Sequence, residues 1–465
     1  MSKKSETVLR LTAAQHDELR RHLFPGDQKE AVALATCGTH RTAKRTVFCV
    51  HQIMPVSDDA CIERSAETVI WPIEPYVPFF GTAARRKMAV LKIHSHPTGY
   101  ERFSGLDDIA DRALLGSLSD LATTETGHMS AVMLPDGRVI ARVLTPERQF
   151  REVTRVIVVG DEVTNYESAP TQKSPSDEAF LRTRQAFGEG TVATLSRMRI
   201  GIVGCSGTGS WVVEMLSRLG VGELVLVDPD VIERKNLNRI VNSVASDARM
   251  GRSKVQIFMR AIRRMGFGTK VSALQADILQ RAVVGALADC DFLFGCVDSA
   301  DGRDALNRIA TFYTVPYIDV GVHLEANGRG GVTQICAAVH YLIPGGSSLL
   351  SRRVITAEQV RAESMRRRAP QQYEALCKEG YIQGVVVDSP AVISINGFAA
   401  SHAVNEMLAR IHPFRRDGNS EFRHQTFALT DGAWLRIEDG APCAYLSKRV
   451  GRGDVEPMLD NSELA

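Results

Sequence analysis

The sequence predicts an α/β protein with two main domains, an α+β domain followed by a doubly wound one. Short strand-like runs with little helix between them occupy much of residues 1–165. Beyond residue 177, apolar runs alternate with helical patterns, which is typical of a mostly parallel sheet covered by helices on both faces. Residues 166–177 (YESAPTQKSPSD) are rich in serine, proline and small polar residues, so we expect a linker there.

The composition is that of ordinary globular domains. The chain has 465 residues, of which 44% are hydrophobic and 24% charged. Its formal net charge of +2 is too small to favour nucleic acid or an anionic membrane as the main partner. Because no apolar run could span a bilayer and no signal-peptide core is present, we expect a cytoplasmic protein. The nine cysteines form no C-x-x-C pair, which argues against a zinc ribbon or a disulfide framework.

The α+β domain is expected to begin with an amphipathic segment at residues 9–23, which ends before Pro25 and Gly26. The strand-like runs that follow are 30–37, 46–54, 65–72, 88–94, 129–134 and 153–159. The run that ends at residue 94 leads into HSHPTGYERFSGLDD, which contains the polar residues of greatest interest in this domain.

Two histidines and an aspartate in this segment could bind a metal. His94 and His96 are two residues apart, so both imidazoles point to the same side of an extended chain. Asp107 follows after one short loop. Two imidazoles and a carboxylate leave one position of a tetrahedral zinc ion open for water, as hydrolysis requires. Glu30 is the candidate general base, and Ser104 could donate a hydrogen bond to the oxyanion of a tetrahedral intermediate.

Other interpretations of these residues stay open. Ser104 and Asp107 also fit the capping box of a helix N-terminus. Paired histidines at the end of a strand are commonly polar loop residues. Glu63 and Glu67 also precede the histidines, so the choice of Glu30 as the base is not unique.

The order of these residues resembles a known signature. H-S-H-P, six residues, then S-x-x-D is similar to the signature of the JAMM (JAB/MPN) metalloproteases, and E-A-x-x-L-x-x-C-G resembles the strand that carries their glutamate. The resemblance covers about residues 8–160. It implies zinc on His94, His96 and Asp107, a general acid/base at Glu30, and cleavage after the C-terminal glycine of a ubiquitin-like protein.

The doubly wound domain opens with a glycine-rich turn. RIGIVGCSGTGSWVVEMLSRLG is predicted to form a strand, a turn and a helix. Gly204, Gly207 and Gly209 would let the turn close tightly and bring backbone N–H groups to a phosphate at the helix N-terminus. Such a turn serves dinucleotides at least as often as ATP, so it does not identify the nucleotide.

The residues that come next favour ATP. The following strand ends in Asp228, Pro229 and Asp230, where a ribose-binding acid is expected. Cationic and amide donors suited to a triphosphate come after it: Asn236, Asn238, Arg239 and Lys254. A further strand ends at Asp298, and Mg²⁺ takes one or two carboxylates together with phosphate oxygens. Each residue taken alone also suits a polar loop or a helix cap, whereas all of them in this order indicate a site.

These motifs together resemble those of the ThiF/MoeB-type ubiquitin-activating enzymes. The matching motifs are D-x-D-V-x-x-x-x-N-L-N-R at 228–239, G-x-x-K at 251–254 and D-x-x-x-x-R-x-x-x-N at 298–307. The resemblance covers about residues 184–411. It implies that Asp230 binds the ribose hydroxyls, that Asn236, Arg239 and Lys254 contact phosphates, and that Asp298 binds Mg²⁺.

The resemblance also implies a domain layout and a dimer. We expect a Rossmann-like adenylation domain at 178–412 with a crossover loop at about 345–385, followed by a small C-terminal β extension at 413–465. The upstream RTRQAFGEG resembles the R-Q entry segment of the family. It implies that Arg184 reaches the nucleotide of a neighbouring subunit in a homodimer.

Two positions depart from the family pattern. Ser206 stands where the turn usually has a second glycine, and so small a residue should be tolerated. The family's zinc-binding cysteine pairs are missing, since the chain reads PGGSSLLS at 344–351 and has only Cys443 near the C-terminus. We therefore predict no structural zinc in this domain.

Cys377 is the one cysteine in the crossing segment, where ubiquitin-activating relatives carry the thiol that accepts the acyl group. The neighbouring Lys378 would favour its thiolate. The same residue also fits a helix-face cysteine that packs with Tyr373 and Leu376. Both interpretations stay open.

The two domains together predict an enzyme that adenylates the C-terminal glycine of a ubiquitin-like β-grasp protein. The fused zinc peptidase would process or deconjugate the same protein, and a conjugating enzyme is an expected partner. The alternative is processing and activation of a sulfur-carrier protein for thiocarboxylate-dependent biosynthesis. A binding module with two degenerate sites conflicts with the retained polar residues, and a hydride-acceptor site for an NAD-dependent oxidoreductase is not apparent.

Overall fold

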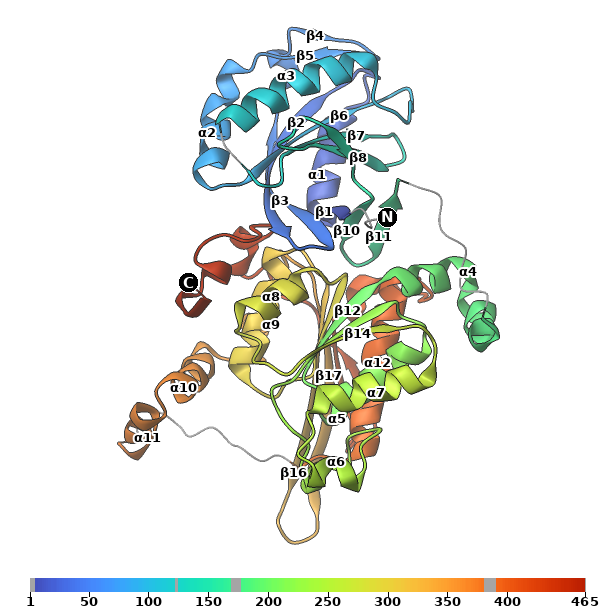
Figure 1. The fold of residues 1–465 in the computed structure, drawn as a ribbon, viewed down its shortest axis with the longest axis vertical. Helices are drawn as coiled ribbons and strands as arrows, with labels where there is room; N and C mark the ends of the chain where they lie inside the picture. Colours follow the sequence, from blue (N-terminus) through green and yellow to red (C-terminus); the bar gives the residue numbers. More distant parts are fainter. Residues whose placement is uncertain (1–4, 122–123, 169–176, 380–389, 465) are drawn as a thin grey trace. The chain divides into compact units, whose positions relative to one another are not determined.

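The structure of the protein is a computed structural model that describes residues 5–121, 124–168, 177–379 and 390–464. It divides into two compact units (Figure 1). The N-terminal unit contains the chain up to Thr171 together with Thr311–Thr314 and Lys448–Ala465, and the C-terminal unit contains Gln172–Ala310 and Val315–Ser447. None of the helices in the described ranges combines the length and apolar composition that a membrane-spanning helix needs.

The N-terminal unit is built on a mixed nine-stranded sheet in the order β11-β10-β1-β3-β2-β6-β7-β8-β9. The strands are β1 (Glu6–Thr12), β2 (Val32–Arg41), β3 (Arg45–Pro55), β6 (Ala89–Ser95), β7 (His128–Met133), β8 (Val139–Leu144), β9 (Phe150–Glu152), β10 (Arg155–Val159) and β11 (Val163–Glu167). A separate two-stranded hairpin consists of β4 (Glu63–Arg64) and β5 (Val69–Ile70). The helices are α1 (Ala13–Leu23), α2 (Val77–Arg85) and α3 (Gly105–Leu121).

Helices cover both faces of this sheet. Successive side chains of a strand point to opposite faces. Ala33 of β2 packs in the same core as Leu19 of α1. Its neighbour Leu34 packs in the other core, with Phe80 of α2 and Leu115 of α3. Because both faces are covered, β2 and β6 are buried along most of their length rather than at alternate residues, as expected of strands covered on two sides.

Three local expectations for this unit differ from the structure. The predicted helical segment at 9–23 starts as strand β1, and the helix begins only after Thr12, whose side chain caps it in a capping box with Gln15. The predicted strand at 65–72 contains only the two residues of β5. Of the expected linker 166–177, Tyr166 and Glu167 still belong to β11, and residues 169–176 lie outside the described residues.

The C-terminal unit contains an eight-stranded sheet in the order β14-β13-β12-β15-β16-β17-β18-β19. The strands are β12 (Arg199–Val203), β13 (Glu223–Val227), β14 (Lys270–Leu274), β15 (Phe292–Gly295), β16 (Tyr317–Ala326), β17 (Val332–Leu342), β18 (His424–Ala428) and β19 (Ala433–Arg436). All pairs from β14 to β16 are parallel, and β16 to β19 are antiparallel. A mixed sheet of this kind fits a Rossmann-like fold.

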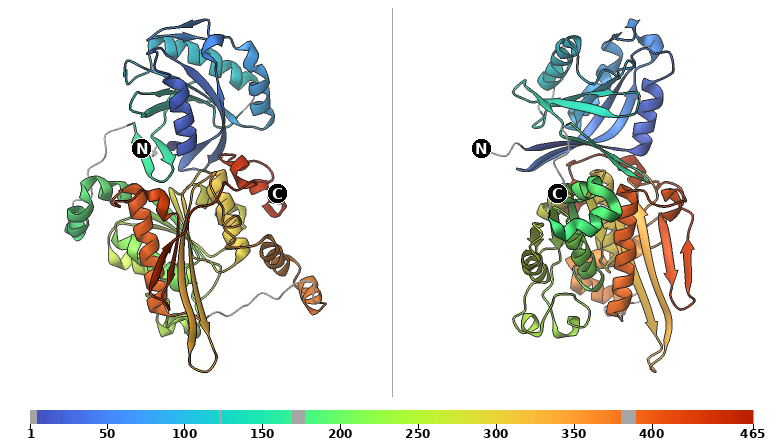
Figure 2. Two further views of the ribbon diagram at one scale, coloured as in Figure 1. Left: turned by 180° about the vertical axis from the view of Figure 1, so that it is seen from behind. Right: turned by 90° about the vertical axis from the view of Figure 1, so that its right-hand side faces the viewer.

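Helices flank this second sheet on both faces (Figure 1), as the alternation of strands and helices predicts. The helices are α4 (Leu181–Arg197), α5 (Gly207–Arg218), α6 (Ala245–Arg249), α7 (Lys254–Met265), α8 (Arg281–Ala288), α9 (Ala300–Phe312), α10 (Ala357–Arg368), α11 (Pro370–Lys378) and α12 (Ile393–Ile411). The expected crossover loop holds α10 and α11, and its residues 380–385 lie outside the described residues. Figure 2 shows the long β16–β17 hairpin from two further sides.

The expected C-terminal extension at 413–465 divides between the two units. Strand β18 pairs with β17, so its first part continues the sheet of the C-terminal unit. Lys448–Ala465 belongs to the N-terminal unit. There Gly38 N–H donates to the Gly451 carbonyl at 3.0 Å, and Asp454 N–H donates to the Thr39 carbonyl at 2.9 Å. The pairing of β2 with β6 ends at Cys37, so this segment covers the edge of β2 that β6 leaves open.

Replacing Gly38 by valine should release this covering segment. A Cβ at Gly38 would lie 2.1 Å from the carbonyl carbon of Arg452, and backbone cannot give way as a flexible side chain can. We expect amide hydrogen exchange to lose its protection at Gly451 and Asp454. Gly81→Ala is the control, because its Cβ would meet only the end of the Arg85 side chain, at 3.5 Å. Unchanged protection in the valine variant would contradict the close contact.

Candidate functional site

The nucleotide-binding residues predicted from the sequence gather at one edge of the C-terminal sheet. The parallel strands run in the order β14-β13-β12-β15-β16, so the order reverses between β12 and β15. Ligands of open α/β sheets bind beyond the carboxyl ends of the strands at such a reversal. The glycine-rich turn follows β12, and Asp298 follows β15. The topology therefore brings them to the same crevice.

The predicted strand, turn and helix are all present here, and the glycines are sterically required. Gly204 has a φ of +88°. A Cβ on Gly204 would lie 2.4 Å from the carbonyl oxygen of Cys296, and one on Gly209 would lie 1.8 Å from the carbonyl oxygen of Gly204. Helix α5 starts at Gly207, so its free N–H groups open onto the turn. A helix N-terminus in this position favours a phosphate.

Asp228 organises the turn that follows β13, a role that the sequence motif alone did not predict. One of its carboxylate oxygens accepts a hydrogen bond from Cys205 N–H at 2.7 Å, and the other accepts one from Asp230 N–H at 2.9 Å. Asp228 is buried, whereas the Asp230 side chain is 65% exposed. The buried acid therefore fixes the turn, and the exposed one is available to a ligand.

Lys254 lies beside both acids. Its Nζ is 2.8 Å from Asp230 Oδ2 and 3.5 Å from Asp228 Oδ1. Burial opposes the charged form, but the attraction of Asp228 and Asp230 prevails and raises the pKa of Lys254. The side chain therefore remains an ammonium group at the edge of the crevice. The structure thus places two predicted ligand-binding residues, Asp230 and Lys254, in direct contact.

Arg239 also borders the turn, whereas Asn236 is used within its own loop. The Arg239 Cδ lies 3.6 Å from the position that a Cβ of Gly207 would take. Its guanidinium donates to the Lys235 carbonyl at 2.8 Å. Asn236 is buried, and its side-chain oxygen accepts a hydrogen bond from Glu233 N–H at 2.9 Å. The loop function that the sequence left open for Asn236 is therefore present in the structure.

Asp298 is exposed beyond β15, next to a buried charge cluster that the sequence motifs did not predict. Arg303 Nε lies 3.4 Å from Asp319 Oδ1, and Tyr317 donates its hydroxyl proton to the same carboxylate at 2.8 Å. The attraction of Asp319 raises the pKa of Arg303 against the opposing effect of burial. Asp298 adds to the rise. The signal available in the sequence was an acid, Asp319, within the apolar run VPYIDV at residues 315–320, which contains the start of β16.

The remaining predicted residues of this unit lie on helices. Arg184, on α4, donates to the Asp177 carbonyl at 3.0 Å, and its contact with a neighbouring subunit stays a prediction. Cys377 lies near the end of α11 and is half-buried. Tyr373, one turn earlier, is buried. Both roles weighed for Cys377, acyl acceptor and packing residue, are compatible with this position.

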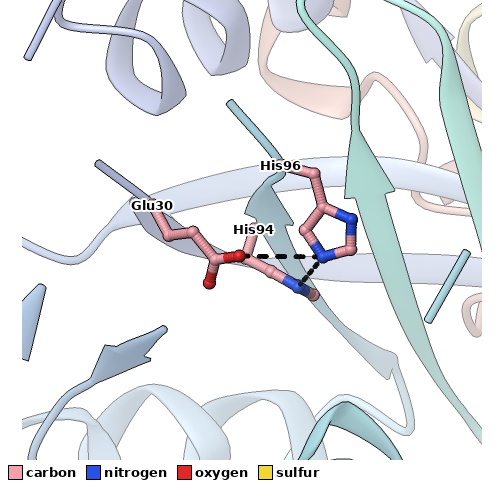
Figure 3. A group of neighbouring side chains, drawn as sticks. All are labelled: Glu30, His94 and His96. Carbon is pink, nitrogen blue, oxygen red and sulfur yellow. Dashed lines mark hydrogen bonds and ion pairs between the residues drawn. The ribbon is translucent and has the colours of Figure 1, made fainter. Parts of the chain in front are cut away.

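In the N-terminal unit, the residues predicted to form the metal site come together. Glu30, His94 and His96 offer ligand atoms within 4.8 Å of one another (Figure 3). The two histidine Nε2 atoms are 3.1 Å apart. Asp107 Oδ1 is 3.0 Å from His94 Nε2, and Asp107 Oδ2 is 3.7 Å from His96 Nε2. Glu30 Oε1 lies 3.8 Å from His96 Nε2.

These distances fit a tetrahedral metal. Ligand atoms about 2.0–2.1 Å from zinc in tetrahedral geometry are about 3.3 Å apart. The 3.1 Å between the two Nε2 atoms and the 3.0 Å from His94 Nε2 to Asp107 Oδ1 lie close to that value, whereas the 3.7 Å contact of His96 Nε2 is with the other carboxylate oxygen, Oδ2. His96 Nδ1 is paired with the Tyr100 carbonyl at 2.7 Å, which leaves Nε2 for the metal. Nitrogen and carboxylate donors in this number suit zinc.

The pKa shifts in this cluster suit His94 and Asp107 as metal ligands and Glu30 as the general base. Burial lowers the pKa of His94 to about 4, so its imidazole is neutral at pH 7, as a metal ligand must be. Burial acts in the opposite direction on Asp107, but hydrogen bonds with His94 and His96 hold the pKa of that carboxyl well below its usual range. Burial raises the pKa of Glu30 to about 7, a value that suits a group that takes up and releases protons.

Ser104 forms the capping box that the sequence left open. Its hydroxyl donates to Asp107 Oδ2 at 2.8 Å, and Asp107 N–H donates back to the hydroxyl at 3.1 Å. Helix α3 begins at the next residue. These two hydrogen bonds fix the orientation of Asp107. The Ser104 hydroxyl could donate to an oxyanion only if it gave up its hydrogen bond to Asp107.

Comparison with known proteins places the C-terminal unit in a family. The profile of the ThiF family matches residues 180–438, which is more than half of the chain. The match begins after Glu30, His94 and His96, so it assigns no family to the N-terminal residues.

Three curated relatives show what the chain resembles. It is 30% identical over 125 residues to the SAMP-activating enzyme E1 of Haloferax volcanii (27% of this chain, 46% of the relative). It is 24% identical over 263 residues to the ubiquitin-like modifier-activating enzyme 5 of Gallus gallus (52% and 64%). It is 29% identical over 159 residues to the molybdopterin-synthase adenylyltransferase of Salmonella typhimurium (33% and 63%). The chain thus spans between about half and two thirds of the length of these relatives, and on the extent of the profile match it belongs to the ThiF family.

Proposed function

We propose that the C-terminal unit adenylates the C-terminal carboxylate of a ubiquitin-like β-grasp protein with ATP. The observation that carries this proposal is the position of the glycine turn, the Asp230–Lys254 pair and Asp298 at the carboxyl ends of β12, β13 and β15, where the strand order reverses. The names of the Haloferax and Gallus relatives support the class of substrate.

The chemistry requires positioning and neutralisation of charge more than acid–base catalysis. An oxygen of the substrate carboxylate attacks the α-phosphorus of ATP, the bond to the β-phosphate oxygen breaks, and acyl-adenylate and pyrophosphate are formed. The N-terminus of α5, Lys254 and Arg239 would stabilise the phosphate charge, and Asp230 would accept hydrogen bonds from the ribose hydroxyls. Mg²⁺ held by Asp298 would neutralise further phosphate charge.

Exchange between ATP and labelled pyrophosphate tests this proposal. The protein should catalyse exchange only when Mg²⁺ and a β-grasp protein that ends in glycine are both present. The same β-grasp protein without its terminal glycine is the matched control, since it lacks the carboxylate that reacts. Equal exchange with the shortened protein, or no exchange with any β-grasp protein encoded by neighbouring genes, would contradict the proposal.

A sulfur-carrier protein is the second candidate substrate. Similarity to a molybdopterin-synthase adenylyltransferase favours it, because that relative is named for adenylylating a biosynthetic enzyme. The two candidates differ in the step after adenylation. Conjugation through a conjugating enzyme would pass through a thioester, whereas transfer of sulfide to the adenylate would not need one.

Replacing Cys377 by alanine should separate these candidates. If Cys377 accepts the acyl group, the variant loses the thiol-sensitive adduct with the β-grasp protein and retains pyrophosphate exchange, because adenylation precedes the transfer. Gel mobility without reducing agent and mass spectrometry would measure the adduct. Cys336→Ala is the control, since Cys336 is also half-buried but lies on strand β17. An adduct that persists without Cys377 would exclude that residue as the acceptor and favour direct sulfide transfer.

We further propose that the N-terminal unit is a zinc peptidase or isopeptidase that acts on the same terminus. His94, His96 and Asp107 would hold zinc, which would polarise the scissile carbonyl and acidify a bound water. Glu30 Oε1 would take the proton of the attacking water and give it to the leaving amine. A fusion of the β-grasp protein to a short peptide tests this, since the protein should cleave it after the terminal glycine and a chelator should abolish cleavage.

The proposed domain arrangement assigns one activity to each unit. Residues 1–165 would carry the peptidase and residues 178–412 the adenylation site, with a linker at 166–177 and the remaining residues, 413–465, shared between the units. A conjugating enzyme would receive the activated protein. A homodimer would bring Arg184 of each subunit to the nucleotide of the other, and sedimentation of the wild-type protein and of Arg184→Ala with and without ATP would test it.

A further inference from the structure

A buried ion network lies next to the proposed zinc ligands. Lys92 stands two residues before His94 on β6, so its side chain leaves the strand on the same side as both histidines. It is only 6% exposed. Its Nζ lies 3.0 Å from Asp111 Oδ1 and 3.8 Å from Asp107 Oδ1. One lysine therefore faces both a proposed ligand and a second acid.

The two acids belong to one face of α3. Asp107 and Asp111 are four residues apart on this helix, so they lie one above the other. On β6, Lys92 and His94 have the matching spacing along the strand. Lys92 therefore meets Asp111 while His94 meets Asp107, at 3.0 Å in each case. This pairing sets the position of the helix along the strand.

A second cation, Arg142, binds the other carboxylate oxygen of Asp111. Arg142 of β8 lies with its Nη2 2.7 Å from Asp111 Oδ2. Its guanidinium stacks 3.8 Å from the ring centroids of Phe103 and Phe150, so it is held in place. Asp111 is fully buried and is thus bound through one oxygen by Lys92 and through the other by Arg142.

The approach of Lys92 to Asp107, its second acidic neighbour, points to a role beyond stabilising the fold. A lysine that only balanced Asp111 would have no need to approach Asp107, and Arg142 already supplies Asp111 with a countercharge. Two neighbouring carboxylates on one helix face repel each other, and this repulsion would push Asp107 away from the histidines unless a cation lay between them. Lys92 occupies that place.

We propose that Lys92 is a positioning residue of the metal site, which holds α3 at the register that keeps the Asp107 carboxylate beside His94 and His96. The inference rests on the zinc site proposed above. Lys92 acts through Asp107 and Asp111 and has no contact of its own with substrate. Partners of this kind commonly change metal affinity 10–100-fold when they are replaced, so we expect a loss of about that size.

Zinc affinity of the full chain, measured by competition with a chromophoric chelator, tests this role. Lys92→Met should bind zinc about 10–100-fold more weakly than the wild-type protein. Lys92→Arg, which keeps the charge, should retain more affinity than Lys92→Met. In the cobalt-substituted protein, the visible absorption of the methionine variant should weaken or shift, because the carboxylate ligand is displaced.

The control removes a comparable buried cation of the same unit. Arg45 is also 6% exposed and pairs with Glu6 at 2.7 Å, on strands β3 and β1. Arg45→Met should lower the melting temperature without changing zinc affinity or the cobalt spectrum. If Lys92→Met does not fold, Asp111→Asn takes its place, because it removes the anchor of Lys92 and should weaken zinc binding in the same way.

The outcomes separate this inference from the function on which it rests. Wild-type zinc affinity in Lys92→Met, or in Asp111→Asn where the methionine variant does not fold, would overturn the role of Lys92 and leave the zinc site standing. A wild-type protein that binds no zinc would overturn the zinc site itself. Equal losses in Lys92→Met and Arg45→Met would show that both act only through stability, and this too would overturn the role of Lys92.

Discussion

Asp298→Ala should lower pyrophosphate exchange about 10²–10³-fold, the loss typical of removing one preorganised electrostatic contact with the reacting group. Asp298 is exposed and follows β15 at the reversal of strand order, so its position is at the proposed crevice and its side chain is not part of the buried core. Its loss should leave phosphate charge uncompensated while the fold remains intact. Initial exchange rates at saturating ATP, over a range of Mg²⁺ concentrations, would measure the effect.

Two further variants sharpen this test. Asp298→Asn keeps the size of the side chain and removes its charge, so it should lose nearly as much activity as the alanine variant. Asp431→Ala removes another exposed acid, from the turn between β18 and β19, and should exchange like the parent. If Asp298→Ala turns over ATP as fast as the parent, neither the magnesium role of Asp298 nor the crevice as the site of adenylation can stand.

His94→Ala should remove zinc from the N-terminal unit and abolish peptide cleavage, while pyrophosphate exchange continues. His94 is almost fully buried, with Nε2 3.0 Å from Asp107 and 3.1 Å from His96, so its loss opens the ligand set at its centre. Zinc content by mass spectrometry of the purified protein would measure the first effect. His22→Ala, on helix α1 of the same unit, should retain both zinc and cleavage.

Glu30→Gln distinguishes a base from a ligand. As the general base, Glu30 can be replaced with retention of zinc, and cleavage should fall about 10²–10⁴-fold. Because the ligand atoms of Glu30, His94 and His96 lie within 4.8 Å of one another, Glu30 is also close enough to bind a metal directly. Loss of zinc from Glu30→Gln would therefore assign Glu30 to the ligands and leave the base unidentified.

The sequence predicts those parts of the protein that depend on local patterns. The alternation of strands and helices, and the glycine turn between β12 and α5, are encoded within a few consecutive residues. The cluster of His94, His96 and Asp107 is also close in sequence, so its spacing is informative. Short apolar runs were less reliable, since residues 65–72 have the composition of a strand but form only β5.

The sequence could not predict contacts that join distant segments or that divide one residue between two roles. Asp319 of β16 pairs with Arg303 of α9, but nothing near Asp319 in the sequence marks its partner. The Lys92–Asp111 pair depends on the register between a strand and a helix. Ser104 and Asn236 have side chains that suit both a ligand and a local cap, and only the structure shows that both are used as caps.

The segment that covers the edge of β2 determines how the protein can be divided. A fragment that stops at residue 165 would lack the backbone partners of Gly38 and Thr39, although it contains every proposed zinc ligand. Such a fragment would carry a bare strand edge prone to self-association. Adding residues 448–464 as a separate peptide should cover this edge again and keep the fragment monomeric. Fragment complementation is therefore a practical route to the isolated peptidase.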